Sequence, residues 1–262
     1  MSDTISILAI TIAAIALIII GLLSPKKKNL LDILPLNEND RVLLETYVSF
    51  YNELNKEKRL EFETRMQHFL STIRITGINT EAERLDEILI SASAIIPIFE
   101  FSNWEYINLN EVLLYPDAFN EKFEQQGAAR STLGVVGEGA YQNIMILSQH
   151  ELRQGFLNEN AKTNTAIHEF VHLVDKTDGA IDGVPEALIS KQYVLPWLQL
   201  MQHNIQKIKN DKSDINPYGA TNQAEFFAVA SEYFFERPDL FQEKHPELYV
   251  LLSKFFRTDL KK

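Results

Sequence analysis

The chain of 262 residues contains no cysteine. Disulfide bonds, cysteine-ligated metal sites, iron–sulfur clusters and thiol nucleophiles are therefore excluded. Positive charge is also scarce, with 25 Lys and Arg against 36 Asp and Glu and a formal net charge of −11. So acidic a protein is poorly suited to neutralising phosphates, and we expect no nucleic-acid partner. Hydrophobic residues make up 45% of the chain, which excludes global disorder and supplies a sizeable core.

Charged residues are missing altogether from the N-terminal run Ile5–Leu23. A helix of these 19 residues would be roughly 28 Å long, about the thickness of the hydrocarbon core of a bilayer. Asp3 is the only charged side chain before the run, whereas Lys26–Lys28 follow it closely. We therefore expect a single-pass membrane anchor. Because positively charged flanks stay on the cytoplasmic side, we expect the rest of the chain to lie in the cytoplasm. A buried core helix and a cleaved leader are the alternatives.

Pro25 is expected to end this transmembrane helix. The chain then divides into an anchor over residues 1–24, a linker over 25–36 and one folded domain over 37–262. Apolar spacing predicts helices over 40–72, with a break near 52–55, and over 81–96, with Thr80 as N-cap. Strands are expected over 73–78, within 99–114 and over 143–147, and a Gly-rich loop over 128–139. The sequence therefore predicts an α+β domain that is mainly helical with a small sheet.

The segment His168–His172, His-Glu-Phe-Val-His, matches the pattern H-E-x-x-H. On a helix, residues four apart lie one turn apart on the same face, so the two imidazoles converge on a single ion. Glu169 is then placed to take a proton from a water at that ion, as a general base. Zinc is the expected metal because nitrogen and carboxylate ligands at an open tetrahedral site suit it. The alternative is a buried helix whose histidines only form hydrogen bonds.

Residues around this segment support a helix. Asn164 or Thr163 can cap its start, and Gly179 lies just past its end. Apolar residues at i, i+3, i+4 and i+7 add a stripe that faces a core, namely Ile167, Phe170, Val171 and Val174. The two histidines lie beside this stripe, where the floor of a cleft would be.

A zinc site of this type needs a third protein ligand, and the candidates lie on the apolar segment from Asn222 to Phe235. Asn222 is a good N-cap, so a helix is expected. Glu225 and Glu232 are the only charged residues of the segment. An ionised carboxylate on so apolar a helix is costly unless it is paired or bound to metal. The two residues are seven positions apart and share one face, so spacing alone leaves open which is the ligand.

Three blocks of sequence, in this order and separation, resemble the Mlc titration factor A family of zinc peptidases, and the resemblance runs from about Leu36 to the C-terminus. The blocks are the H-E-x-x-H segment with Asp175, then Asp182-Gly183-Val184-Pro185, then Tyr218-Gly219-Ala220-Thr221 leading into Ala224-Glu225-Phe226-Phe227-Ala228. The last two blocks are also similar to the catalytic domain of anthrax lethal factor. The resemblance therefore implies a zincin-like metallopeptidase domain.

The resemblance also implies roles for individual residues. His168, His172 and Glu225 would be the zinc ligands, as in a gluzincin, in which a distal glutamate completes the H-E-x-x-H site. Glu169 would be the catalytic base. Tyr218 matches the tyrosine whose hydroxyl is thought to assist the tetrahedral intermediate. Better-known members of the family are soluble, whereas this chain begins with an apolar span, which favours a membrane-proximal role.

Alternatives stay open for three further residues. Tyr218 lies in a Pro-Tyr-Gly turn. Either its hydroxyl reaches a developing oxyanion, or its ring merely packs against the turn. Asp175 either accepts an imidazole N–H or satisfies the end of the helix. Glu232 either supports the metal ligands or pairs with a basic residue elsewhere.

The function expected from these residues is zinc-dependent hydrolysis of peptide bonds by a membrane-anchored enzyme. A peptide or protein is the expected substrate, and the resemblance leans towards aminopeptidase action. We expect an extended peptide to pair with the strand over 143–147, as the edge of the cleft. Hydrolysis of a non-peptide amide would use the same site. The alternative function is a regulatory binding module, because the resemblance implies a cytoplasmic partner, a sugar-uptake transcriptional repressor that is sequestered without catalysis.

Overall fold

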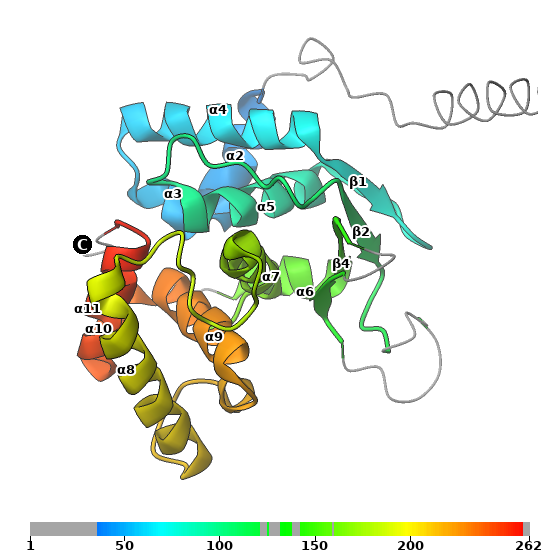
Figure 1. Cartoon of the computed structure of the whole chain (residues 1–262). Coiled ribbons are helices and arrows are strands. Elements are labelled where there is room, and N and C mark those ends of the chain that lie inside the picture. Colours follow the sequence, from blue (N-terminus) through cyan, green and yellow to red (C-terminus); the bar gives the residue numbers. More distant parts are fainter. Residues whose placement is uncertain (1–35, 121–124, 126–131, 138–141, 159, 259–262) are drawn as a thin grey trace, which may run out of the picture.

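Figure 1 shows the computed structural model of the chain, which describes residues 36–120, 125, 132–137, 142–158 and 160–258. These residues form mainly helices with one four-stranded sheet, which confirms the predicted α+β class. The expected membrane anchor, residues 1–24, and residues 25–35 of the expected linker lie outside them. Among the helices that the structure does describe, none is both long and apolar enough to cross a bilayer.

The first part of the domain consists of α2 (Glu38–Tyr47), α3 (Ser49–Glu53), α4 (Lys56–Thr72) and α5 (Arg84–Ile95). Asn37 caps α2 in a reciprocal pair with Asp40, and Asn55 caps α4. The break predicted near 52–55 is confirmed, and an extended Val48 adds a second break between α2 and α3. Both α2 and α4 pack against α5, so these helices form one layer of the domain (Figure 1).

The start of α5 differs from the predicted cap at Thr80. The helix begins at Arg84, and its N-cap is Glu83, which forms a reciprocal capping box with Asp86. Thr80 instead donates a hydrogen bond of 2.6 Å from its hydroxyl to Oε1 of Gln149, 69 positions further along the chain. A tertiary partner has therefore displaced the local cap that the sequence indicates.

The sheet contains β1 (Arg74–Gly77), β2 (Glu111–Tyr115), β3 (Gly134–Val136) and β4 (Ile144–Ser148), in the order β1-β2-β4-β3. The pairs β1–β2 and β2–β4 are parallel, whereas β3 runs antiparallel to β4. The strand expected over 73–78 is thus confirmed. Of the range 99–114, only the last residues belong to a strand.

Two predictions about the sheet are wrong. The range 128–139, expected to be a loop, contains β3. The strand expected over 143–147 is β4, which lies between β2 and β3 and is therefore not an edge of the sheet. A short strand such as β3 forms because β4 offers it a row of backbone partners, which no local pattern of its own sequence reveals.

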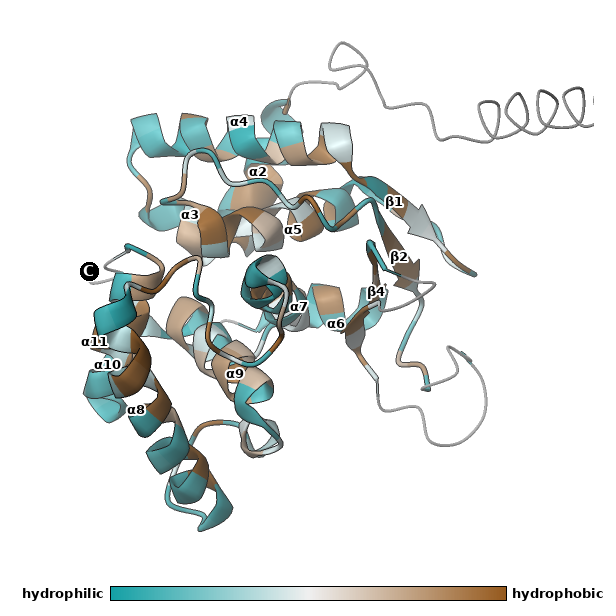
Figure 2. Cartoon of the chain, in the orientation of Figure 1, coloured by the Kyte–Doolittle hydropathy of each residue, from teal (hydrophilic) through white to brown (hydrophobic). Residues whose placement is uncertain are grey.

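The described residues after the sheet also form α6 (Gln149–Leu157), α7 (Thr165–Asp175), α8 (Lys191–Lys209), α9 (Gln223–Glu236), α10 (Pro238–Lys244) and α11 (Pro246–Phe255). Helix α7 lies at the centre, in contact with α5, α9 and β3 (Figure 1). In Figure 2, α9 is mostly hydrophobic, whereas α4 and α8 carry hydrophilic residues along much of their length. The two helices predicted to hold the metal site are therefore neighbours in the interior.

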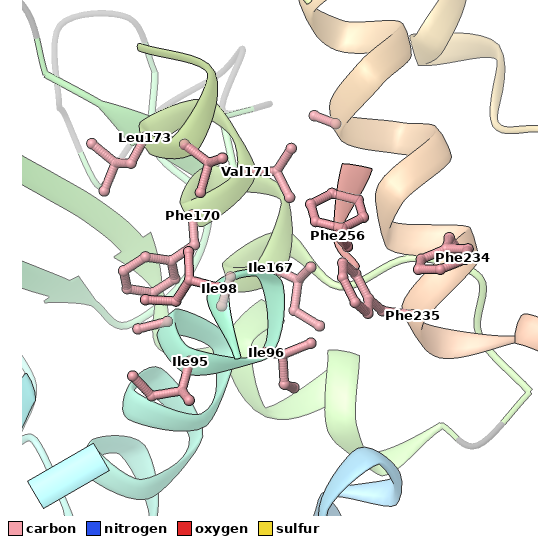
Figure 3. Packing of buried hydrophobic residues seen from close by; sticks show 14 of the residues in the cluster. Ile95, Ile96, Ile98, Ile167, Phe170, Val171, Leu173, Phe234, Phe235 and Phe256 are labelled. Atoms are coloured by element: carbon pink, nitrogen blue, oxygen red, sulfur yellow. The ribbon is translucent and has the colours of Figure 1, made fainter. Parts of the chain in front are cut away.

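Apolar side chains hold α7 in this position, and Figure 3 shows several of them around the helix. Phe170 is fully buried, and its ring centroid lies 5.7 Å from that of Phe69 and 5.2 Å from that of Tyr106. Burying one such side chain stabilises the fold by about 1.5–3 kcal/mol. The predicted core stripe is confirmed, since Ile167, Val171 and Val174 are also buried. The metal-site residues thus project from a helix fixed on several sides.

Candidate metal centre

Helix α7 begins as the sequence predicts. Asn164 is the N-cap, and its Oδ1 accepts a hydrogen bond of 3.2 Å from the backbone N–H of Ile167. The helix ends at Asp175 and is followed by one 3-10 turn, after which Gly179 adopts a left-handed conformation with φ of +101°. His168 and His172 therefore both lie within the regular turns of the helix, on one face.

Helix α9 presents the third candidate ligand. Asn222 caps it through a hydrogen bond of 2.9 Å from the backbone N–H of Glu225 to its side-chain Oδ1. Glu225 therefore lies in the first turn, where the helix dipole favours a negative charge. The packing of α9 against α7 brings this turn next to the two histidines.

Three side chains from the two helices converge on one point. Nε2 of His168 lies 3.0 Å from Nε2 of His172 and 3.0 Å from Oε2 of Glu225. Nε2 of His172 lies 3.5 Å from the same carboxylate oxygen. Two imidazole nitrogens and one carboxylate oxygen form the donor set that a zinc ion with an open position accepts. The residues present therefore fit a divalent metal.

Glu232 occupies a different place from Glu225. Its Oε1 lies 2.6 Å from Nδ1 of His168, and its Oε2 accepts the backbone N–H of Asn164 at 2.7 Å. A carboxylate at Nδ1 keeps the proton on that nitrogen and leaves the lone pair of Nε2 free for a metal. The structure thus places Glu225 at the point of convergence and Glu232 behind His168, a choice that spacing left open.

Burial and charge set the protonation of this group. Burial lowers the pKa of the His168 imidazole, but the charge of Glu232 and hydrogen bonds with Glu225 and Glu232 raise it well above its ordinary value. Burial raises the pKa of Glu225, yet hydrogen bonds from His168 and His172 outweigh it and lower the pKa to about 2. Glu225 therefore stays ionised, as an anionic ligand must be.

Glu169 lies beside the convergence point, on the side of the sheet. Its side chain is buried, and burial raises the pKa of the carboxyl group, while the neighbouring His168 and His172 oppose that rise. A raised pKa brings a carboxylate closer to the range in which it accepts a proton efficiently. A Cβ atom at Gly134 of β3 would stand only 2.7 Å from Oε1 of Glu169. The absence of a side chain at position 134 is therefore what makes room for Glu169.

A cleft of about 580 Å³ opens over these residues. Tyr218 lies at its side in a short 3-10 turn (Pro217–Ala220); its side chain is half exposed, and its ring centroid lies 6.0 Å from that of His168. Burial of the phenol and then the charge of Glu225 raise the pKa of Tyr218, which keeps its hydroxyl protonated. Gly134, Val136 and Ile181 also line the cleft, and their place at the site is not indicated by the sequence. Gly134 belongs to the segment predicted as a Gly-rich loop, and a glycine can mark a place where another group approaches the backbone closely.

Within the described part of the chain, Asp175 does not accept a hydrogen bond from an imidazole, which was one of its two expected roles. Its Oδ2 accepts the backbone N–H of Gly183 at 2.8 Å, so it fastens the segment that follows the helix. Among the described residues, neither its Oδ1 nor Nδ1 of His172 has a hydrogen-bond partner. Burial raises the pKa of Asp175 to about 6.

Comparison with known proteins agrees with this geometry. A family model described as glucose-regulated metallo-peptidase M90 matches residues 23–257. The uncharacterised protein slr2042 of Synechocystis sp. is 30% identical over 240 residues, which are 85% of this chain and 84% of that protein. Mlc titration factor A of Salmonella arizonae is 30% identical over 206 residues, 74% of this chain and 80% of that protein. Mlc titration factor A of Escherichia fergusonii is 27% identical over 222 residues, 80% of this chain and 82% of that protein. These findings confirm the resemblance seen in the sequence, and the chain belongs to the glucose-regulated metallo-peptidase M90 family.

Proposed function

We propose that this chain is a membrane-anchored, zinc-dependent peptidase with a zincin-like, gluzincin-type site. One observation carries the proposal. His168, His172 and Glu225 offer three metal-binding atoms within 4.8 Å of one another, in a cleft that also holds Glu169. The membership of a metallopeptidase family supports the reaction class. The donor set supports zinc over magnesium or calcium, which prefer oxygen ligands.

The protein residues then have separate tasks in hydrolysis. His168, His172 and Glu225 would hold the zinc ion, which would supply Lewis-acid chemistry for the scissile carbonyl and for a water molecule. Glu169 accepts a proton from the attacking water and delivers it to the leaving nitrogen. The hydroxyl of Tyr218 donates a hydrogen bond to the oxygen on which negative charge develops. Glu232 holds His168 in the tautomer that keeps Nε2 available.

The substrate peptide is proposed to pair with β3, the edge strand beside the cleft, in place of the internal β4. Leu133 and Gly137 form backbone hydrogen bonds with β4. In an antiparallel strand, the backbone N–H and C=O groups of alternate residues face opposite edges of the strand. The backbone groups of Gly134 and Val136 therefore face the open edge, where an extended peptide adds a strand. A substrate N-methylated at the amide that pairs with β3 should show a higher KM, and an unchanged KM would contradict this binding mode.

The Glu169→Gln variant tests the reaction. The amide keeps the shape of the side chain but cannot act as a base, so zinc should be retained while peptide hydrolysis falls by at least about 100-fold. Zinc content and turnover of a peptide library report the two effects. Glu186→Gln, an exposed change on the segment after α7, is the control and should leave both unchanged. Hydrolysis that survives in purified Glu169→Gln protein would contradict the peptidase proposal.

Aminopeptidase action is proposed as the mode of cleavage, from the resemblance to the Mlc titration factor A family. Matched peptides with a free and an acetylated N-terminus distinguish it from endopeptidase action. The free peptide should lose its first residue, and the acetylated peptide should resist cleavage. Cleavage of both peptides at an internal bond would show an endopeptidase.

The proposed anchor is the apolar run of residues 5–23, with the catalytic domain in the cytoplasm. The absence of charge over 19 residues and the three lysines that follow support it. Deleting residues 1–24 should move the protein from the membrane fraction to the supernatant, whereas deleting residues 2–4 should not. A chain lacking residues 1–24 that still sediments with membranes would contradict the anchor.

Sequestration of a cytoplasmic transcriptional repressor is the second candidate function. The observation that favours it is the name of several relatives, Mlc titration factor A. Such binding needs no catalysis, so the Glu169→Gln protein should capture the repressor as well as the wild type does. Capture that depends on Glu169 would point to a substrate instead of a binding partner.

A further inference from the structure

The segment after α7 is fastened at one glycine. The backbone N–H of Gly183 donates to Oδ2 of Asp175, the last residue of α7, at 2.8 Å. The carbonyl of Gly183 accepts a hydrogen bond of 2.7 Å from Nε1 of Trp197, in α8. Both bonds are buried. Gly183 is therefore held from two sides by side chains of two different helices.

Gly183 also lies directly against the start of α9. Its φ is +79°, and a Cβ atom at this position would stand 2.3 Å from the carbonyl oxygen of Gln223 and 3.1 Å from the backbone nitrogen of Ala224. These are the first two residues of α9, and Glu225 follows them. No side chain fits between Gly183 and the turn that carries the third metal ligand.

Trp197 closes the arrangement from the other side. The indole is fully buried, and its ring lies 6.0 Å from that of Phe226 and 5.9 Å from that of Phe227. Both phenylalanines follow Glu225 directly in α9. The backbone of Glu225 is therefore flanked by Gly183 before it and by Trp197 after it.

We infer that Asp175, Gly183 and Trp197 are positioning residues that fix Glu225 against His172 and thereby set the zinc affinity of the site. We refer to these three residues as the Gly183 clamp. Asp175 is three residues beyond His172 on α7, so the clamp links the end of the helix bearing the histidines to the turn bearing the glutamate. Metal sites tolerate displacements of only about 0.5 Å before affinity falls, and outer contacts hold their ligands in place.

The inference rests on the proposed function, because it takes Glu225 as a metal ligand. It goes beyond that proposal by assigning the Asp182-Gly183-Val184-Pro185 block a role in metal binding. Asp182 contributes locally, since its Oδ1 accepts the backbone N–H of Val184 and shapes the turn at Gly183.

Two glycine variants of the full chain, purified in detergent, test the clamp. Gly183→Ala should weaken zinc binding by at least about tenfold, because its Cβ displaces the first turn of α9. Gly179→Ala is a matched control on the same segment, since Gly179 also has a positive φ of +101° but nothing lies within 4 Å of its Cβ position. It should bind zinc as the wild type does. The zinc dissociation constant is measured by competition with a chromophoric chelator, and the visible spectrum of the cobalt-loaded protein reports the ligand geometry.

A second pair of variants covers the case in which Gly183→Ala fails to fold. Trp197→Phe removes the N–H that Gly183 needs and keeps an aromatic ring, so zinc binding should weaken about fivefold to tenfold. Tyr51→Phe is the control, because it removes another buried hydrogen bond, from the hydroxyl of Tyr51 in α3 to Glu63 in α4, two helices that carry none of the proposed ligands. It should leave zinc affinity unchanged.

The outcomes separate the clamp from the proposed function. Wild-type zinc affinity in both Gly183→Ala and Trp197→Phe would overturn the clamp, and so would an equal loss in Gly179→Ala or Tyr51→Phe. A wild-type chain that binds no zinc would overturn the proposed function itself. Loss of affinity in the clamp variants alone, with an altered cobalt spectrum, is the result that the inference predicts.

Discussion

Helix α9 approaches the same imidazole with two glutamates that lie two turns apart. The first turn carries Glu225, whose side chain is 16% exposed to the cleft and reaches Nε2 of His168 and of His172. Two turns later, Glu232 is only 5% exposed and contacts Nδ1 of His168 from behind. Two glutamates on one face of α9 thus contact the two different nitrogens of the His168 ring.

The two glutamates therefore differ in how exposed they are and in which nitrogen of His168 they contact. Glu225 lines the cleft of about 580 Å³, so its charge is accessible to a metal. Glu232 has both oxygens occupied, one by His168 and one by the backbone N–H of Asn164. An enclosed carboxylate of this kind is suited to orienting the imidazole of His168.

Glu225→Ala is expected to have the largest effect on this comparison. Removal of one of the three proposed protein ligands should weaken zinc binding by at least about 100-fold, measured by chelator competition and by metal content after dialysis. Thermal unfolding of the metal-free protein serves as the control for the fold. Full zinc occupancy in this variant would move the third ligand to another residue and remove the distinction between the two glutamates.

Glu232→Gln should have a smaller effect in the same assay. The amide still accepts a hydrogen bond from Nδ1 of His168 but carries no charge, so zinc should bind about tenfold more weakly, still at one ion per chain. The ratio of the zinc dissociation constants of the two variants measures how differently Glu225 and Glu232 contribute to zinc binding. Equal losses in Glu225→Ala and Glu232→Gln would show that both residues are ligands.

Gly134→Ala should leave zinc affinity almost unchanged and lower kcat. The new Cβ meets the carboxylate of Glu169, which is the proposed base and not one of the proposed ligands, and should displace it. A displacement of about 1 Å at such a group costs up to about 100-fold in rate. Steady-state kinetics at saturating zinc provide the measurement. A wild-type kcat would contradict the placement of Glu169 against β3.

Asp214→Asn should have the smallest effect on zinc and should alter stability instead. Asp214 contacts the other end of α9, where it accepts a hydrogen bond from Tyr233. It also pairs with Lys162 and His245. Burial raises its pKa, but the hydrogen bonds from Lys162, His245 and Tyr233 outweigh it and lower the pKa well below the ordinary value of 3.8. Zinc affinity should stay at the wild-type value.

The sign of the pH dependence follows from that lowered pKa. A carboxyl group whose pKa is lowered in the folded state stabilises the fold above its unfolded pKa, near 3.8, and loses this contribution as the pH falls below it. The Tm of Asp214→Asn should therefore lie about 2–4 °C below that of the wild type at pH 7. The gap should narrow below pH 3.8, and a gap independent of pH would contradict the ionic role of Asp214.

The sequence predicts the helices of the site well, and the reason is local. Asn164 and Asn222 cap their helices as expected, because a cap depends on residues only three positions away. The i and i+4 spacing of His168 and His172 likewise depends on the helix alone. These features together specify two of the three candidate ligands and the neighbouring Glu169.

The sequence does not predict features that depend on distant partners. Glu225 and Glu232 have the same spacing and surroundings, and only the packing of α9 on α7 separates them. Strand β3 arises from its pairing with β4, so the Gly-rich segment around Gly134 gives no strand pattern of its own. Thr80 is an equally good local cap, but it bonds to Gln149 instead.

Anomalous diffraction at the zinc edge, on crystals of the zinc-loaded chain, would locate the metal. We expect a single peak per chain within bonding distance of Nε2 of His168, Nε2 of His172 and a carboxylate oxygen of Glu225, with Glu232 still on Nδ1 of His168. A peak elsewhere, or one bound by Glu232 in place of Glu225, would contradict this expectation.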